Sequence, residues 1–219
     1  MDASDEAVDV SGARRAIYLD NAATAWPRPP AVADAVADAI RGEFATPGRG
    51  AHVFARNAGG IVERARTGLA RLINAEAPER IVFTSGATDG LNLAIRGVVE
   101  AQREERGGGA GCVDVVTTVI EHNAVLRPLR MLEERGEARV TVVECDEESF
   151  VDAEAFVGTA PEGCGLAVVS HASNVTGAMQ DVAGIARRLR ERRPECLLVV
   201  DAAQTVGLAD VDVRAMGAD

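Results

Sequence analysis

Residues 113–143, VDVVTTVIEHNAVLRPLRMLEERGEARVTVV, contain two short aliphatic runs, 113–116 and 140–143, separated by a helical pattern. The apolar positions of that pattern lie at helical spacing, at Val125, Leu129 and Leu132. A strand, a helix and a second strand in this order predict two parallel strands joined by a crossover helix. This stretch therefore predicts an α/β fold.

The same alternation extends to both sides of that stretch. Further aliphatic runs occupy 81–83, 166–169 and 197–200. Helical stripes separate the runs, with apolar positions at Leu91, Ala94, Ile95 and Val98 and at Val182, Ile185, Ala186 and Leu189. Together these elements predict a mainly parallel sheet with helices packed on its faces. The glycine-rich segment 107–111 is typical of a surface connection.

The N-terminal part has a different pattern. We expect an acidic tail over 1–16, a short strand over 17–19 and a polar turn over 20–24. The prolines of 27–30 suit the start of a helix. Two amphipathic helices are predicted to follow, with stripes at Val32, Ala35, Val36, Ala39 and Ile40 and at Ala58, Ile61, Val62, Ala65, Leu69, Leu72 and Ile73.

The composition excludes several classes of protein. The 219 residues carry 23 Lys+Arg against 34 Asp+Glu, a net charge of -11, and every basic side chain is arginine because the chain contains no lysine. This acidic balance argues against binding to nucleic acid or to an anionic membrane surface. The N-terminus lacks the apolar core of a secretory signal, and no run is long enough to span a bilayer. We therefore expect a cytoplasmic protein.

The four cysteines, Cys112, Cys145, Cys164 and Cys196, are widely spaced, with no CxxC pair and no nearby histidine. This spacing is typical neither of a zinc site nor of a disulfide framework. We expect no metal site and four reduced, structural thiols.

The residues that follow each predicted strand are the candidates for chemistry, because ligands of an open α/β sheet bind outside the carboxyl ends of the strands. Run 81–83 is followed by TSGAT, 84–88, which opens a helix. The free amides of such a helix start suit a phosphate. In a simpler interpretation, Ser85 or Thr88 only caps the helix.

The other strand ends carry single polar groups. His122 begins a helix, although a lone histidine is more often structural. Asn174 stands beside a glycine turn, where asparagine is common. Asp201 directly follows a strongly apolar strand, so its carboxylate should be partly desolvated and need a partner. Gln204 adds a second amide close to Asp201.

Together these strand ends supply an anion cradle, an imidazole, two amides and a carboxylate along one edge of the sheet. Pyridoxal 5'-phosphate (PLP) requires such a set. It needs a helix N-terminus for its phosphate, a carboxylate to keep its pyridine nitrogen protonated, donors to its phenolic oxygen and a flat group on its ring. The combination predicts a PLP site.

Five motifs in sequence order resemble the class V aminotransferase superfamily, and within it the cysteine desulfurases. They are YLDNAAT (18–24), FTSGAT (83–88) followed by LNLAIRG, EHNAVL (121–126), SNVTGAMQDV (173–182) and VVDAAQTVG (199–207). The resemblance implies the large domain of a fold type I PLP-dependent transferase over 17–219, incomplete at its C-terminus and without the small C-terminal domain. It also implies a homodimer and a sulfur-acceptor protein for the complete enzyme.

The resemblance implies roles for the matching residues. Ala87 and Thr88 would bind the cofactor phosphate. His122 would stack on the ring and relay protons, and Asp201 would pair with the pyridine nitrogen. These last two residues would be catalytic.

Further positions follow from the same resemblance. Asn174 and Gln204 would hydrogen-bond the phenolic side of PLP. Asn21 and Ala22 would lie near the substrate at the entrance of the active site. The segment PGRGAHVFARNA, 47–58, matches a family region close to the active site and the dimer contact.

In the family, a segment like VDVRAMGAD continues into a Ser-Gly-His-Lys motif whose lysine forms the Schiff base with PLP. That lysine is not among the 219 residues. We therefore expect the N-terminal part of a longer enzyme, truncated before the lysine and inactive alone. In complete form it would convert L-cysteine to L-alanine and transfer the sulfur as a persulfide. None of the four cysteines matches the persulfide position.

Two other functions stay open. A selenocysteine lyase or another class V enzyme would share these motifs, because the residues specific for sulfur follow Asp219 in the family. A non-catalytic remnant that keeps the dimer surface would also lack the lysine. A nicotinamide or nucleoside triphosphate site does not fit, since the chain has neither GxGxxG after residue 83 nor the lysine of a P-loop.

Overall fold

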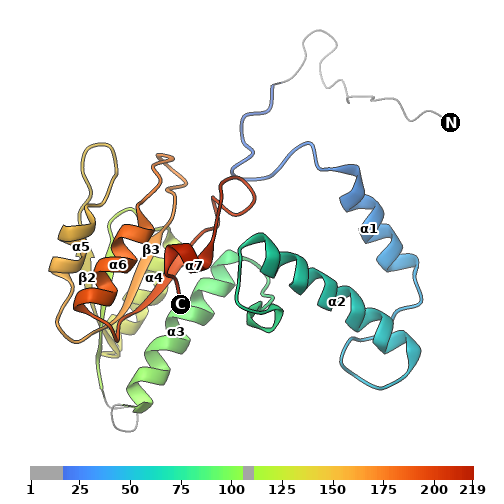
Figure 1. Ribbon diagram of the computed structural model, residues 1–219, viewed down its shortest axis with the longest axis horizontal. Helices are drawn as coiled ribbons and strands as arrows, with labels where there is room; N and C mark the ends of the chain where they lie inside the picture. The colour runs from blue at the N-terminus through green and yellow to red at the C-terminus, as the bar shows by residue number, and fades with distance from the viewer. Residues whose placement is uncertain (1–16, 106–110) are drawn as a thin grey trace. The chain divides into compact units, whose positions relative to one another are not determined.

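The computed structural model describes residues 17–105 and 111–219. The predicted acidic tail, 1–16, and nearly all of the glycine-rich segment 107–111 lie outside the described residues. The chain divides into two compact units, one ending at Phe44 and the other running from Ala45 to Asp219 (Figure 1).

In the first unit, the described residues form one helix, α1 (Pro30–Arg41). Pro29 is its N-cap and Pro30 occupies the first helical turn, where a missing amide costs no hydrogen bond. The predicted helix start is therefore confirmed. No residue of α1 is buried, and Ile40 on its apolar stripe is 79% exposed.

The segment before α1 is a turn. The amides of Ala23 and Thr24 donate to the carbonyl oxygen of Asp20, and the Tyr18 hydroxyl donates to the Thr24 carbonyl at 2.7 Å. The predicted polar turn over 20–24 is confirmed. The predicted strand over 17–19 is wrong, because these residues form no ladder with another strand among those described.

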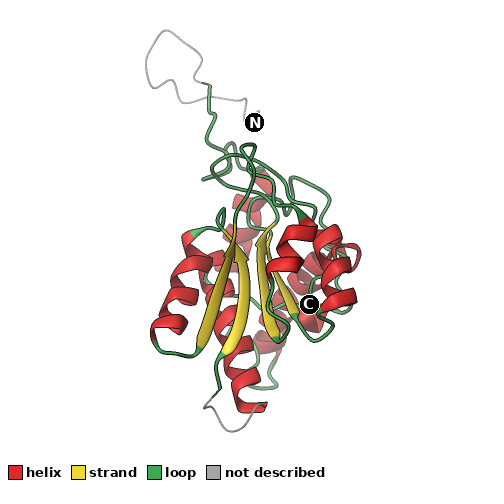
Figure 2. Ribbon diagram, turned by 90° about the vertical axis from the view of Figure 1, so that its left-hand side faces the viewer, coloured by secondary structure: helices red, strands yellow, loops and turns green. Residues whose placement is uncertain are grey.

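The second unit is built on a four-stranded parallel sheet in the order β2-β1-β3-β4 (Figure 2). The strands are β1 (Val113–Thr118), β2 (Ala138–Val143), β3 (Cys164–Ser170) and β4 (Leu197–Asp201). Each strand contains one of the predicted runs, so the α/β class and the parallel sheet are confirmed. Every residue of β3 is buried, because this inner strand is covered on both faces.

Helices cover both faces of the sheet. On one face, α3 (Ala87–Glu105) and α4 (Asn123–Glu134) share a core with β1 and β3. On the other face, α5 (Ala153–Thr159), α6 (Val182–Arg192) and α7 (Val213–Met216) surround a second core. The helical stripes of α3, α4 and α6 were predicted. The short helices α5 and α7 were not, since neither is long enough to show a period.

The remaining elements of this unit are the predicted α2 (Val53–Leu72) and the one-turn η1 (Pro78–Arg80). After η1 the predicted strand over 81–83 is wrong. The segment is extended, but none of the four described strands pairs with it, and Val82 is 66% exposed. It is attached to α2 instead, because Arg66 donates to the Ile81 carbonyl and its guanidinium lies 5.1 Å from the centre of the Phe83 ring.

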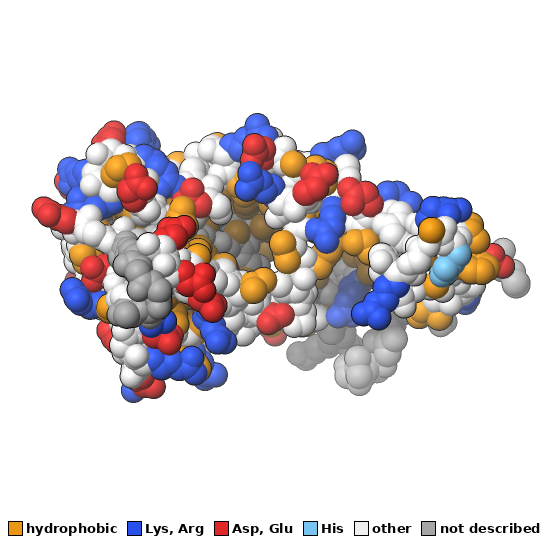
Figure 3. Space-filling model, turned by 90° about the horizontal axis from the view of Figure 1, so that it is seen from below, with side chains coloured by type: hydrophobic (Ala, Val, Ile, Leu, Met, Phe, Trp, Pro, Cys, Tyr) orange, Lys and Arg blue, Asp and Glu red, His pale blue; other side chains and the backbone are white. Residues whose placement is uncertain are grey.

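The surface is mixed in charge. On the face in Figure 3, acidic and basic side chains are interspersed rather than gathered by sign. None of the helices in the described ranges combines the length and the apolar character that a membrane span requires.

Candidate functional site

A cavity of about 200 Å³ opens where the carboxyl ends of β1, β3 and β4 meet the amino end of α3. From β1 the chain runs first to β2 on one side of it, and later to β3 on its other side. The loops after β1 and β3 therefore diverge, which is where open α/β sheets form their ligand crevices.

The cavity collects the residues predicted to bind the cofactor. It is lined by Ala87, Thr88, Leu91, His122, Ala124, Ser170, Ala172, Asn174, Asp201, Ala203 and Gln204. All six predicted cofactor-binding residues are among them, although they come from four separate parts of the chain. Their roles as ligands stay predictions, but the fold brings them together.

The amino end of α3 forms one wall. The amide of Gly90 donates to the Gly86 carbonyl at 3.0 Å, and the helix amides before it have no acceptor within the helix. The Ser85 hydroxyl donates to the Asp89 carboxylate at 3.0 Å, so Ser85 does not act as a capping acceptor. Ala87 and Thr88 thus line the cavity where the helix dipole favours an anion.

His122 lies at the N-cap of α4. Its Nδ1 accepts a hydrogen bond from the Ala124 amide at 3.1 Å, so the neutral ring carries its proton on Nε2. The side chain is exposed while it lines the cavity. The structural role therefore uses one ring nitrogen and leaves the other, a donor, for a ligand.

Asp201 ends β4 and is half-buried. Its Oδ1 accepts from the Ala203 amide at 2.9 Å, which fixes the orientation of the carboxylate. Asn174 stands in a turn that Ser173 stabilises, since the Ser173 hydroxyl accepts from the Thr176 amide at 3.2 Å. The first bond orients the Asp201 side chain, and the second stabilises the turn that carries Asn174.

Glu121 is bonded to the cavity-lining residue Ser170 and was not predicted to have a role. The side chain is 6% exposed and accepts three hydrogen bonds: from the Thr118 hydroxyl at 2.6 Å, the Ser170 hydroxyl at 2.6 Å and the Ser170 amide at 2.8 Å. Burial raises the pKa of Glu121, and the bonds from Ser170 and Thr118 oppose that rise. The sequence signal was a glutamate placed between an apolar strand and a helix cap.

His171 is a second buried polar group that sequence reasoning missed. Its Nδ1 lies 2.9 Å from Oγ1 of Thr205, whose hydroxyl donates to the Ala202 carbonyl at 3.2 Å. The His171 ring must therefore donate to Thr205. Burial lowers the pKa of His171, which favours the neutral ring. This contact ties the loop after β3 to the loop after β4.

The cavity is electrostatically dipolar. The positive end of the α3 dipole forms one wall, and the Asp201 carboxylate lies on the sheet side. No arginine is among the residues that line it. A ligand with an anionic group at one end and a protonated nitrogen at the other matches this charge distribution, and PLP has both.

The structure shows the local bonds of the predicted substrate residues and of segment 47–58. Asn21 and Ala22 belong to the first unit, where Oδ1 of Asn21 accepts from the Trp26 amide at 2.9 Å. In segment 47–58, Nδ1 of His52 caps α2 by accepting from the Ala55 amide at 3.3 Å. No residue of segment 47–58 lines the cavity. Their proposed functions stay predictions.

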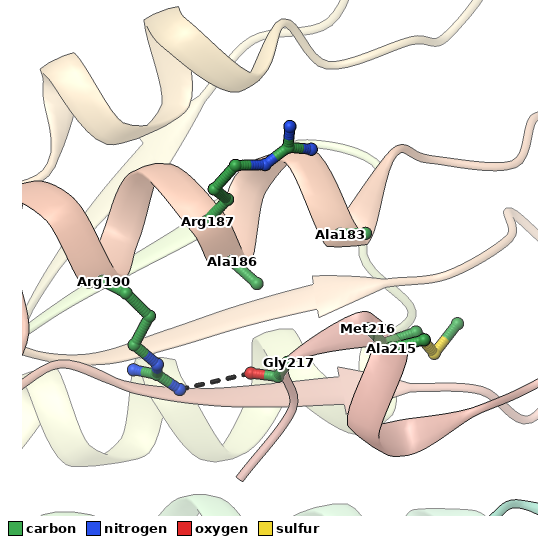
Figure 4. A pocket seen from close by; sticks show the side chains of 7 residues that line it. All are labelled: Ala183, Ala186, Arg187, Arg190, Ala215, Met216 and Gly217. Atoms are coloured by element: carbon green, nitrogen blue, oxygen red, sulfur yellow. Dashed lines mark hydrogen bonds between the residues drawn. The ribbon is translucent and has the colours of Figure 1, made fainter.

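A larger hollow of about 380 Å³ lies between α6 and α7 (Figure 4). Arg190 is already bonded there, to the carbonyl oxygens of Cys196 at 2.6 Å and Gly217 at 3.2 Å. The other charged side chain, Arg187, points away from the rest of the lining in Figure 4. No converging set of polar groups marks this hollow as a site.

The fold also brings two cysteines together. The Sγ atoms of Cys164 and Cys196 lie 3.6 Å apart, and both thiols are free and buried. The hydrogen bond to Cys164 and burial both raise the pKa of the Cys196 thiol. This environment agrees with structural thiols, although no sequence pattern indicated that the two would meet.

Comparison with known proteins places these features in a family. The family described as aminotransferase class-V matches residues 17–219. Cysteine desulfurase IscS of Pseudoalteromonas translucida is 36% identical over 205 residues, which are 93% of this chain and 48% of the relative. The IscS of Azotobacter vinelandii is 37% identical with the same coverage. The chain thus spans about half the length of the curated relatives it matches.

Solved structures of similar proteins also match most of this chain. A structure described as SspA in complex with cysteine superposes with a TM-score of 0.82 at 28% identity, covering 92% of this chain and 55% of that one. The apo cysteine desulfurase of Thermococcus onnurineus NA1 gives a TM-score of 0.81 at 28% identity, covering 93% and 48%.

Proposed function

The chain belongs to the class V aminotransferase family, and on that basis we propose that its cavity binds PLP and forms the cofactor half of a cysteine desulfurase. The complete protein would convert L-cysteine to L-alanine and pass the sulfur on as a persulfide. The observation that carries this proposal is the convergence of six predicted residues in one dipolar cavity.

Each wall of the cavity has a task in this proposal. Ala87 and Thr88, at the start of α3, hold the phosphate through backbone amides and a hydroxyl. Asp201 accepts a hydrogen bond from the pyridine nitrogen and keeps it protonated. Asn174 and Gln204 bond the phenolic side. Together they fix the cofactor at both of its ends.

When bound, PLP supplies an electron sink that stabilises negative charge at the substrate α carbon. Asp201 maintains the positive charge on which that sink depends. His122 covers the ring, and its Nε2 holds or moves a proton beside it. The hydrogen bonds that Asp201 and His122 accept from backbone amides orient both groups before the ligand arrives.

The 219 residues contain no lysine, so they can hold PLP only without a covalent bond, apart from the N-terminal amine. Turnover would require the lysine that the family places after a segment like VDVRAMGAD. We further propose a homodimer, a sulfur-acceptor protein and a cytoplasmic location for the whole protein. Cysteine as substrate is supported by the relative solved in complex with cysteine.

The absence of lysine makes a clean binding experiment possible. Isothermal titration of the chain with PLP should give one binding site per chain, without the background that surface lysines cause. Asp201→Asn should weaken PLP binding about tenfold or more, because a hydrogen bond to a charged partner is lost.

Asp210→Asn is the matched control, since Asp210 is exposed and does not line the cavity. Its affinity for PLP should equal that of the unmodified chain. The proposal fails if the unmodified chain does not bind PLP, or if Asp201→Asn and Asp210→Asn bind it equally well.

A further inference from the structure

Ser170 and Asp201 lie side by side at the cavity. They are register partners at the ends of the neighbouring parallel strands β3 and β4. Paired positions on adjacent strands are about 5 Å apart, and their side chains point to the same face. Both residues line the cavity, so a group bonded to the Asp201 carboxylate lies close to Ser170.

The hydrogen of the Ser170 hydroxyl is already committed. It donates to Oε2 of Glu121 at 2.6 Å, while the Ser170 amide donates to Oε1 of the same carboxylate at 2.8 Å. The Thr118 hydroxyl, which also donates to Oε1, holds the carboxylate from the β1 side. A serine oxygen whose hydrogen is used in this way offers only lone pairs to a ligand.

We propose that Ser170 is a second hydrogen-bond acceptor beside Asp201, and that the pair selects a ring carrying an N–H donor. Glu121 is the positioning residue, because its bonds with Ser170 fix the hydroxyl hydrogen away from the cavity. This inference rests on the proposed PLP site and adds that the site distinguishes a ring with an N–H donor from a ring without one. A ring with carbon in place of the nitrogen would meet two unsatisfied acceptors.

Two probes measure this discrimination directly. One is PLP, and the other is 1-deazapyridoxal 5'-phosphate, which keeps the phosphate and the phenol but has C–H in place of the ring nitrogen. The ratio of the two dissociation constants isolates the contribution of the N–H donor. We expect the unmodified chain to prefer PLP.

Ser170→Ala should reduce that preference about fivefold, as expected for one hydrogen bond, and should leave affinity for the deaza probe nearly unchanged. Glu121→Gln should reduce it by a similar factor, because the new amide can donate to Ser170 and turn the hydroxyl hydrogen outward. The double variant should lose no more than either single variant, since the two residues act through one another.

Three comparisons separate this effect from general damage. Ser170→Thr retains a hydroxyl and should recover most of the preference. Glu144→Gln, at an exposed glutamate directly after β2, should leave the preference unchanged. Thermal unfolding without ligand checks that each variant is folded. If Glu121→Gln does not fold, the result for Ser170→Ala decides the outcome.

The outcomes distinguish the two proposals. If the unmodified chain binds neither probe, the PLP site itself is wrong and the inference falls with it. If the chain binds PLP but Ser170→Ala keeps the full preference, the PLP site stands and the inference alone is overturned. Loss of preference in Ser170→Ala with recovery in Ser170→Thr supports it.

Discussion

The helices α1 and α6 have the same pattern of apolar residues but differ in how far those residues are buried. Both carry an apolar stripe at helical spacing, and both were predicted as amphipathic. Yet α6 buries Ile185 and Leu189 completely against the sheet, whereas no residue of α1 is buried and Ile40 is 79% exposed. A stripe thus predicts that a helix has a face to bury, and it does not identify what covers that face.

The largest expected effect comes from making the same substitution in both helices. Ile185→Ala should lower the free energy of unfolding by about 2–5 kcal/mol, because it leaves a cavity in a packed core. Ile40→Ala should change it by less than about 0.5 kcal/mol, as at other exposed positions. Urea unfolding of both variants tests the contrast. Equal effects would mean that the α1 stripe is covered in solution.

The same contrast explains how far the sequence predicted the fold. Five helices followed from the spacing of apolar residues and four strands from short aliphatic runs, because each of these patterns is contained within its own segment. The strand predicted over 81–83 failed, since an apolar run becomes a strand only where a neighbour completes its ladder. The pattern within a segment cannot show that neighbour.

The residues that line the cavity were predicted better than the buried residues that bond to the loops around it. Asp201 and His122 stand directly at element ends, and the parallel direction of the predicted strands is enough to place them at one edge of the sheet. Glu121 and His171 were missed because their roles depend on burial and on partners far along the chain, Ser170 and Thr205. Such contacts appear only when the loops after β1, β3 and β4 are in place.

Burial should also change how stability depends on pH. The pKa of Glu121 is raised above its ordinary value of 4.5, so the folded chain holds that proton more tightly than the unfolded chain. The free energy of unfolding should therefore fall as pH rises from 4.5 through the folded pKa. Glu121→Gln should remove this part of the decline in urea unfolding measured across that range, and Glu144→Gln should retain it. Identical slopes in the two variants would contradict the assignment.

The smallest effect is expected at Glu154, an exposed acid whose pKa is shifted in the opposite direction to that of Glu121. Glu154 is bonded to Arg192 at 2.6 Å and to Arg188 at 3.2 Å, and its hydrogen bond to Arg192 is the main cause of its lowered pKa. Its contribution to stability is therefore complete above pH 4.5 and is lost as pH falls through the folded pKa.

Glu154→Gln should reduce the free energy of unfolding near neutral pH only slightly, and high salt should erase the difference, because exposed ion pairs are weak and screened. Urea unfolding at low and high salt measures both. A loss as large as that of Ile185→Ala would be incompatible with an exposed pair. Since Glu121 and Glu154 lie in the same unit, opposite pH slopes in their variants would separate the effect of burial from that of ion pairing within one structure.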